Sequence, residues 1–419
     1  MYKDCEIGSI PTNWNIQKLE ELANVTGGKR LPKGSSLSEI NNGHPYIRVS
    51  DMNDKGIQLD SMLYVPDDVV EQISRYRVDK DDLYISVAGT LGLVGKVPDE
   101  LNGANLTENA DRISNIRCNT DFLLYCLKSD FIKKIINSEM TTNAQPKLAL
   151  TRIKQFPIPV PPLKEQQKIA EILSSVDAAI EKTEQVIAKT EEVKKGLMQQ
   201  ILTKGIGHTE FKQTEIGEIP VGWNVINLEE ICSLITYGFT NPMPTTDEGP
   251  YMITAKDIRD GDIQYKTARK TSMECYSNDL TDKSRPSIGD ILITKDGTLG
   301  RLAIVKQEDI CINQSVARIV LKDINLVKYI YYLLDSPQVQ TRILAESGGS
   351  TIKHIYITKL AKTLIPISTD VEETKNITNI LDSYDYKISS EKRKCNYLIN
   401  IKKGLMQQLL TGQVRVKID

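Results

Sequence analysis

Apolar side chains recur at alternating steps of four and three residues over two long stretches of the chain. The first stretch begins after Pro162, because the proline-rich residues 159–162 favour extended backbone and disfavour helix. Its apolar steps are Ile169, Leu173, Val176, Ile180, Ile187, Leu197 and Ile201, and polar residues occupy the remaining steps at Thr183, Thr190 and Lys194. This alternation is typical of the contact seam of a coiled coil.

The second stretch uses the same frame with more polar interruptions. Its steps fall on Ile377, Leu381, Tyr384, Ile388, Glu391, Cys395, Leu398, Lys402, Leu405 and Leu409. Each stretch holds about 40 residues, which predicts helices of roughly 60 Å at ~1.5 Å per residue. A simpler alternative is that each stripe only packs against a globular core.

Two equivalent seams in one chain favour an antiparallel coiled coil between the two helices. The positions expected to form this spacer and its docking surface are Ile169, Leu173, Ile180, Leu197, Met198, Ile377, Leu381, Ile388, Leu405 and Met406.

The segment before each predicted helix contains short β-like runs separated by glycine turns. Residues 45–49 and 82–87 in the first segment correspond to residues 250–254 and 289–294 in the second, and a helical stretch follows in each. The pattern predicts an α+β fold. Two globular mixed α/β domains are separated by the two long helices, with a pseudo-twofold internal repeat.

The chain is duplicated. Lys-Gly-Leu-Met-Gln-Gln occurs at residues 195–200 and again at residues 403–408, an offset of 208. Such a period is too long for a solenoid repeat of roughly 20–50 residues. The expected segments are a first domain at 1–162, a central helix at 163–205, a second domain at 206–370 and a C-terminal helix at 371–419.

Net charge, cysteine and histidine content and the length of apolar runs limit the kinds of function that the chain can have. The 419 residues carry a net charge of −2, so a DNA-binding surface would need clustered basic groups on an acidic background. Seven cysteines without Cys-x-x-Cys spacing favour a reducing cytoplasm, and three histidines cannot supply a histidine-rich metal site. No apolar run approaches the ~18 residues of a membrane span.

Several motifs carry a family resemblance. Pro-Pro-Leu-x-Glu-Gln at residues 161–166 opens the first long helix, and Lys-Gly-Leu-Met-Gln-Gln closes both helices. Each copy begins with Ile-Pro-x-x-Trp, at residues 10–14 and 219–223. Together these motifs resemble the specificity subunit of type I restriction–modification systems. The second copy differs at residues 366–374, Pro-Ile-Ser-Thr-Asp-Val-Glu-Glu-Thr, which leaves the geometry of its helix entry open.

The resemblance implies a non-catalytic subunit whose two target recognition domains each bind half of a bipartite site in double-stranded DNA. It also implies two modification subunits that bind S-adenosylmethionine and two restriction subunits that use ATP and Mg²⁺, with no cofactor held by this chain. Polar seam residues such as Lys194 and Lys402 suggest that helices of the modification subunits cover them.

The motifs of stand-alone enzymes are missing from the sequence. There is no phosphate-binding Gly-x-x-x-x-Gly-Lys-Ser/Thr loop and no Asn/Asp-Pro-Pro-Tyr tetrapeptide of amino-methyltransferases. Gly-Thr-Leu-Gly occurs in both copies, at residues 89–92 and 297–300. It is either a tight turn between strands or a phosphate contact through Thr90 and Thr298.

Base-contacting residues are expected where the two copies differ, since identical domains would recognise a palindrome. Arg and Lys suit guanine, Asn and Gln suit adenine, and Lys also suits phosphate. The candidates in divergent loops are Lys29, Arg30, Lys33, Asn143, Gln145 and Lys147 in the first copy, and Tyr237, Thr240, Asn241, Ser350, Thr351 and Lys353 in the second. The rival interpretations are a coiled-coil scaffold without DNA binding and a stand-alone nuclease or methyltransferase.

Overall fold

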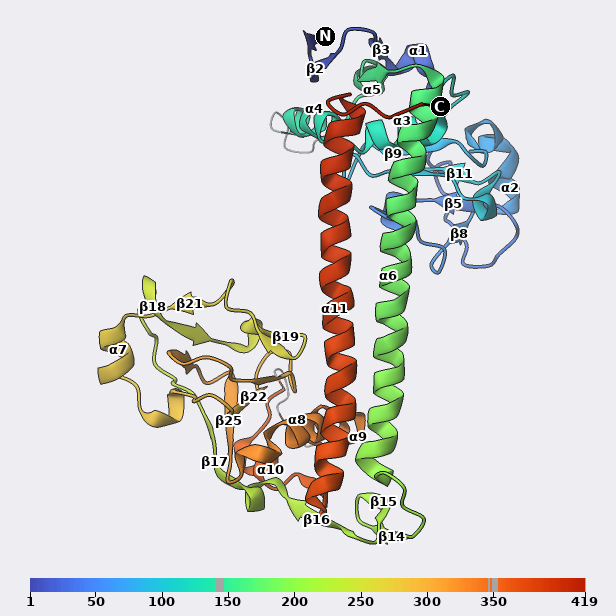
Figure 1. Ribbon diagram of the computed structural model, residues 1–419. Helices are drawn as coiled ribbons and strands as arrows, with labels where there is room; N and C mark the ends of the chain where they lie inside the picture. The colour runs from blue at the N-terminus through green and yellow to red at the C-terminus, as the bar shows by residue number, and fades with distance from the viewer. Residues whose placement is uncertain (141–146, 346, 349–352, 419) are drawn as a thin grey trace. The chain divides into compact units, whose positions relative to one another are not determined.

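The protein contains two compact units. The computed structural model describes residues 1–140, 147–345, 347–348 and 353–418 (Figure 1). Unit 1 comprises Met1–Glu184 and Arg393–Asp419, and unit 2 comprises Gln185–Lys392. The boundary cuts two long helices, α6 (Leu163–Lys204) and α11 (Val371–Leu410), so each unit holds part of both. The four segments expected from the sequence treat each helix as a segment of its own.

Unit 1 is built on a four-stranded antiparallel sheet in the order β10-β9-β12-β4. Its strands are β4 (Asn24–Gly27), β9 (Leu83–Ser86), β10 (Val94–Lys96) and β12 (Ala110–Ser114). A three-stranded sheet in the order β11-β5-β8 contains one parallel pair, β11 with β5. Its strands are β5 (Pro45–Ile47), β8 (Leu63–Tyr64) and β11 (Asn105–Leu106).

Short strand pairs and helices complete unit 1. The pairs are β1 (Tyr2–Cys5) with β2 (Gly8–Pro11), β3 (Asn15–Lys18) with β13 (Pro157–Val160), and β6 (Met52–Asn53) with β7 (Gly56–Ile57). The helices are α1 (Leu19–Leu22), α2 (Asp67–Val70), α3 (Thr120–Leu127), α4 (Asp130–Met140) and α5 (Leu150–Lys154).

Unit 2 repeats this topology. Its central antiparallel sheet has the order β17-β25-β22-β23, with β17 (Cys232–Tyr237), β22 (Ile291–Thr294), β23 (Leu302–Ile304) and β25 (Val316–Leu321). The three-stranded sheet is β21 (Arg269–Lys270), β18 (Thr246–Ile253) and β24 (Ile310–Ile312), with β18 and β24 parallel. The internal repeat of the sequence is therefore also a repeat of strand order, and each unit mixes helix with sheet.

The remaining elements of unit 2 also have counterparts in unit 1. The strand pairs are β14 (Phe211–Thr214) with β15 (Gly217–Pro220), β16 (Trp223–Asn227) with β26 (Leu364–Ser368), and β19 (Ile258–Arg259) with β20 (Asp262–Ile263). The helices are α7 (Met273–Asn278), α8 (Val327–Asp335), α9 (Pro337–Ala345) and α10 (Ile357–Ala361).

The ends of the long helices belong to the cores of the units. Ile169 and Leu173 of α6 are buried in the core of unit 1, which also holds Leu409 of α11. In unit 2, Met198 and Ile377 are buried in the same way. Fully burying an aliphatic side chain contributes roughly 1.5–3 kcal/mol. The simpler alternative, a stripe packed on a globular core, therefore holds at the helix ends.

The remaining predicted spacer positions are shielded to different degrees. Leu381 is fully buried and Ile388 is nearly so. The half-buried positions are Ile180, Leu197, Leu405 and Met406. The polar seam residues Thr183 and Thr190 are buried, and each hydroxyl donates at 2.7 Å to the carbonyl oxygen four residues earlier in α6. These two interruptions of the seam are thus satisfied within their own helix.

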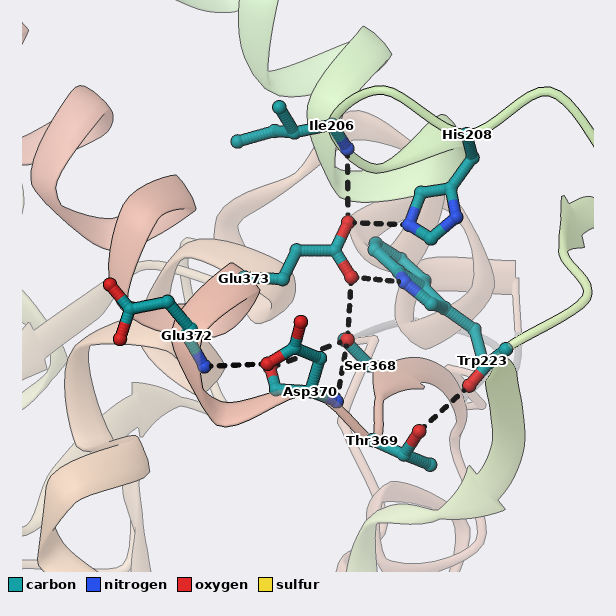
Figure 2. A network of polar contacts seen from close by, with 9 residues as sticks. Ile206, His208, Trp223, Ser368, Thr369, Asp370, Glu372 and Glu373 are labelled. Atoms are coloured by element: carbon teal, nitrogen blue, oxygen red, sulfur yellow. Dashed lines mark hydrogen bonds and ion pairs between the residues drawn. The ribbon is translucent and has the colours of Figure 1, made fainter.

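The second helix entry uses polar capping where the first uses proline. α11 begins at Val371, 208 residues after the start of α6 at Leu163, so the different sequence leaves the helix start unchanged. Asp370 Oδ1 accepts a hydrogen bond from Glu372 N at 2.8 Å, which caps the first turn (Figure 2).

Glu373 holds this entry to the rest of unit 2 (Figure 2). Its Oε1 accepts from Ile206 N at 2.9 Å and lies 2.8 Å from His208 Nε2. Its Oε2 accepts from Trp223 Nε1 at 2.8 Å and from Ser368 Oγ at 2.6 Å. Burial acts to raise the pKa of Glu373, but these hydrogen bonds outweigh it and hold the pKa below its usual range.

Unit 1 contains the equivalent arrangement with different basic chemistry. Glu165, 208 residues before Glu373, accepts from Arg415 Nε at 3.0 Å. The Arg415 guanidinium lies 5.8 Å from the ring centre of the buried Trp14. A basic side chain that follows the end of one long helix therefore pairs with the glutamate that opens the other helix, once within each unit.

Candidate nucleic-acid interface

In unit 1 the candidate loops meet at one edge of the central sheet. β4 ends at this edge, opposite the beginning of β12. Just beyond β4, Lys29 N donates to Leu106 O at 2.8 Å. Leu148 lies at the same edge, because its backbone N donates at 2.9 Å to the carbonyl oxygen of Val87, the residue that follows β9. The structure thus brings the predicted residues Lys29 and Lys147 to one end of the sheet.

Gly28 allows the backbone to approach closely at this edge. A Cβ atom at Gly28 would lie 2.0 Å from Thr107 O, which no side chain tolerates. Gly28 N donates to Ala110 O at 3.0 Å, so the basic loop is fixed to β12. The glycine of this loop therefore serves close packing of the backbone.

Basic side chains are exposed on this loop. Lys29, Arg30 and Lys33 all face solvent, and Arg30 Nε donates to Glu108 Oε1 at 3.0 Å. The Arg30 side chain is 75% exposed, and such a surface ion pair contributes only ~0–1 kcal/mol. The guanidinium can therefore leave Glu108 for a phosphate or a guanine at little cost.

Asp111 is a buried carboxylate at the same edge. Burial raises its pKa to about 6, while the positive charges of Lys147 and Lys154 oppose that rise. Asp111 Oδ2 accepts no hydrogen bond from the described residues. Sequence analysis missed this group, although a carboxylate at a buried strand position is an unusual residue choice.

Unit 2 forms the corresponding edge with different side chains. Tyr237 ends β17 opposite Ala317 of β25. Lys295 N donates to Ser315 O at 2.9 Å, and Ile355 N donates to Lys295 O at 2.9 Å. Tyr237, the segment after β22 and the segment around residue 354 therefore meet, as their counterparts do in unit 1.

A charged cluster at this edge was not predicted. His354 Nδ1 lies 2.5 Å from Asp296 Oδ1, and Lys295 Nζ lies 3.2 Å from the same carboxylate. The Lys295 ammonium also lies 5.4 Å from the ring centre of Tyr237, which is 45% exposed. The sequence signal was present, because Lys295-Asp296 replaces Val-Ala immediately before the repeated Gly-Thr-Leu-Gly.

The two Gly-Thr-Leu-Gly segments are tight turns between paired strands. Ser86 Oγ donates to Thr90 O at 2.5 Å, and Thr294 Oγ1 donates to Thr298 O at 2.5 Å. The turns join β9 to β10 and β22 to β23. Thr90 and Thr298 are exposed on them, and phosphate contact by these residues stays a prediction.

Some of the remaining predicted DNA-contacting residues lie within the described part of the chain and others do not. Thr240, Asn241 and Lys353 are exposed, as is Lys147. The candidates that lie outside the described residues are Asn143, Gln145, Ser350 and Thr351.

The described part of the chain contains no group of three or more His, Cys, Asp or Glu side chains placed to hold a metal ion. Among its helices, none is both long and apolar enough to cross a membrane.

A repeated sheet edge with exposed lysines in both units fits a class of protein that contacts nucleic acid at two places. The sequence matches the family described as type I restriction modification DNA specificity domain, over residues 11–192 and 220–400. The chain belongs to this family, whose members are the DNA-recognition subunits of type I restriction–modification systems.

Relatives and solved structures agree with this assignment. The chain is 29% identical to the putative type I restriction enzyme MjaX specificity subunit of Methanocaldococcus jannaschii, covering 99% of this chain and 97% of the relative. It is 25% identical to the EcoBI specificity subunit of Escherichia coli, covering 97% and 86%. The fold is similar to the S subunit from M. genitalium, with a TM-score of 0.53, 14% identity and coverage of 97% of both chains.

Proposed function

We propose that each unit recognises one half of an asymmetric, bipartite site in double-stranded DNA. The observation that carries this proposal is the repeated sheet edge, whose strand order is the same in both units while its side chains differ. Unit 1 presents Lys29, Arg30 and Lys147 there, and unit 2 presents Tyr237, Asn241 and Lys353. Two different surfaces on two equivalent frames recognise two different half-sites.

The side chains fit distinct parts of the DNA. Arg30 suits the O6 and N7 atoms of guanine, and Asn241 suits the N6 and N7 atoms of adenine. Lysines such as Lys33 and Lys353 suit phosphate groups, which position the protein without specifying bases. Positive charge at the edges compensates for the overall negative charge of the chain, because binding to DNA depends on the local field.

The long helices act as an antiparallel coiled-coil spacer and dock the modification subunits. Ion pairs within each unit support this pairing. In unit 1, Asp177 of α6 pairs with Lys402 of α11, and in unit 2, Lys194 of α6 pairs with Asp385 of α11. From the first pair to the second, the residue number rises on α6, from 177 to 194, and falls on α11, from 402 to 385. This is expected for helices that run in opposite directions.

The chain itself is non-catalytic and works in the cytoplasm with two modification and two restriction subunits. S-adenosylmethionine, ATP and Mg²⁺ are bound by those subunits. The catalytic motifs missing from the sequence support this division of labour.

DNA binding by the complex of this chain with its modification subunits tests the proposal. We expect affinity to fall by orders of magnitude as salt rises from 50 to 200 mM, because binding of lysine and arginine to phosphates releases counterions. The variant K29A/K33A should lower the affinity. It should also reduce the slope of log K against log salt by about one for each removed lysine that binds a phosphate.

The matched control is K3A, which removes an exposed lysine from the β1–β2 hairpin and should leave both quantities unchanged. An affinity and a salt slope that K29A/K33A leaves unchanged would favour a protein scaffold that does not itself contact DNA.

A further inference from the structure

The lysines that interrupt the apolar seams are ion-paired within the chain. In unit 1, Lys402 Nζ of α11 lies 2.6 Å from Asp177 Oδ1 of α6. Tyr125 OH of α3 donates to the other oxygen of this carboxylate at 2.8 Å. The lysine ammonium also lies 5.7 Å from the centre of the Tyr125 ring. One carboxylate thus joins both long helices to a helix of the globular part.

Unit 2 contains the same triad. Lys194 Nζ of α6 lies 2.5 Å from Asp385 Oδ1 of α11, and Tyr332 OH of α8 donates to Asp385 Oδ2 at 2.6 Å. The ammonium lies 5.1 Å from the centre of the Tyr332 ring. The lysines, like the aspartates, are 208 residues apart in the two triads, so the arrangement follows the internal repeat.

The second triad carries more charge than the first. Tyr125 OH also contacts Ser174 Oγ at 3.3 Å, whereas Tyr332 OH also lies 2.8 Å from Asp382 Oδ1 and donates its single hydrogen to one of the two carboxylates at a time. Lys328 Nζ lies 2.5 Å from Asp382 Oδ2. Burial, together with the neighbouring carboxylates, raises the pKa of Tyr332, so its phenol remains a hydrogen-bond donor.

Shielding of the lysines makes these pairs demanding in geometry, while the Asp385 and Asp177 side chains are 43% and 40% exposed. The Lys194 side chain is 14% exposed and the Lys402 side chain is 24% exposed. A shielded lysine without its aspartate would leave an uncompensated charge, which costs far more than the removal of an exposed pair. A single polar group in an apolar seam can fix the register of two helices in this way. Partner subunits are therefore not needed to explain these polar seam positions.

We propose that Lys194–Asp385–Tyr332 and Lys402–Asp177–Tyr125 are positioning residues that set the gap between the two DNA half-sites. Each triad fixes the register of the helix pair and, through the tyrosine, the position of a recognition domain along it. The half-site bases are contacted elsewhere, at the sheet edges, so the triads act on gap length alone. This inference rests on the proposed function.

The test measures methylated bases in a host that carries the complete system with each variant in turn. K194M removes the charge, and Y332F removes the link to α8 while leaving the ion pair. We expect both variants to keep the half-site sequences. Methylation at sites whose gap differs by one base pair should rise about tenfold relative to the natural gap, a loss of about 1.4 kcal/mol in discrimination.

Two further variants separate positioning from general loosening. K194R retains a charged partner for Asp385 and should restore gap selectivity. K392M removes an exposed pair, Lys392 with Glu191, that joins the same two helices at 2.8 Å, and should behave as the unmodified chain does.

The proposal is overturned if Y332F and K194M lead to methylation only at sites with the natural gap. It is also overturned if K392M raises methylation at the other gap lengths as much as they do. If the unmodified chain yields no bipartite site, the proposed function fails first. A bipartite site whose gap is indifferent to the triads rejects this inference alone.

Discussion

At the scale of single residues, equivalent positions in the two units carry the same contact with different chemistry. Glu165 and Glu373 both open a long helix and both accept from a basic side chain, Arg415 in one unit and His208 in the other. The repeat in the sequence predicts that these positions correspond. It does not predict the partners, because Arg415 is 250 residues from Glu165 and only the fold brings them together.

Replacing Glu373 with glutamine should destabilise unit 2 by about 2 kcal/mol at pH 7, since hydrogen bonds to a charged group each contribute ~1.5–3 kcal/mol. The pKa of Glu373 is lowered in the folded state. Its contribution is therefore complete above the unfolded pKa and is lost as the pH falls through the folded value. Urea unfolding at pH 7 and at pH 3 measures the difference.

The neighbouring E372Q is the matched control, because the Glu372 side chain is exposed. Equal effects of the two substitutions, or an E373Q effect that persists undiminished at pH 3, would contradict the role assigned to Glu373.

Asp111 should respond in the opposite sense. Its pKa is raised to about 6, so the ionised carboxylate destabilises the fold increasingly as the pH rises from about 4 through 6. D111N should therefore stabilise the protein by roughly 2 kcal/mol above pH 7 and have almost no effect at pH 4. Thermal unfolding across this range gives the comparison with D54N, an exposed control. Destabilisation by D111N at pH 8 would refute the argument.

At the scale of elements, the long helices were the most predictable part of the molecule. Heptad spacing over some 40 residues predicts a helix before its packing partners are known, and α6 begins at Leu163 as the preceding prolines predict. The strands were predictable in kind but not in pairing, because pairing joins distant segments such as β3 with β13. The loops at the sheet edges were predicted, because the two copies diverge there. The Lys295–Asp296–His354 cluster was not predictable, because it depends on a contact between residues 58 positions apart in the sequence.

Lengthening both helices tests their role as a spacer. Four residues inserted at each unit boundary, after Glu184 in α6 and after Lys392 in α11, should add about 6 Å between the recognition domains. The gap should grow by one or two base pairs, since each base pair spans ~3.4 Å. The same insertion after Glu308, in an exposed loop, should leave the gap unchanged. An unchanged gap after the helix insertions would reject the spacer role.

At the scale of the whole molecule, duplication provides two copies of one frame, and divergence of the loops gives each copy its own surface. The strand order β10-β9-β12-β4 recurs as β23-β22-β25-β17, so the loops of both units emerge from equivalent positions. In one unit Lys29 and Arg30 follow β4, and in the other Tyr237 ends β17 and Asn241 follows it. We therefore expect an asymmetric target.

The most direct test is a map of the methylated bases in a host that carries the complete system. The same map is made for a host whose system carries this chain with Arg30 and Lys33 replaced by alanine. The account predicts two unlike half-sites separated by an unspecific gap, with the substitutions changing recognition of one half-site only. A single continuous palindrome, or a change in both half-sites at once, would contradict it.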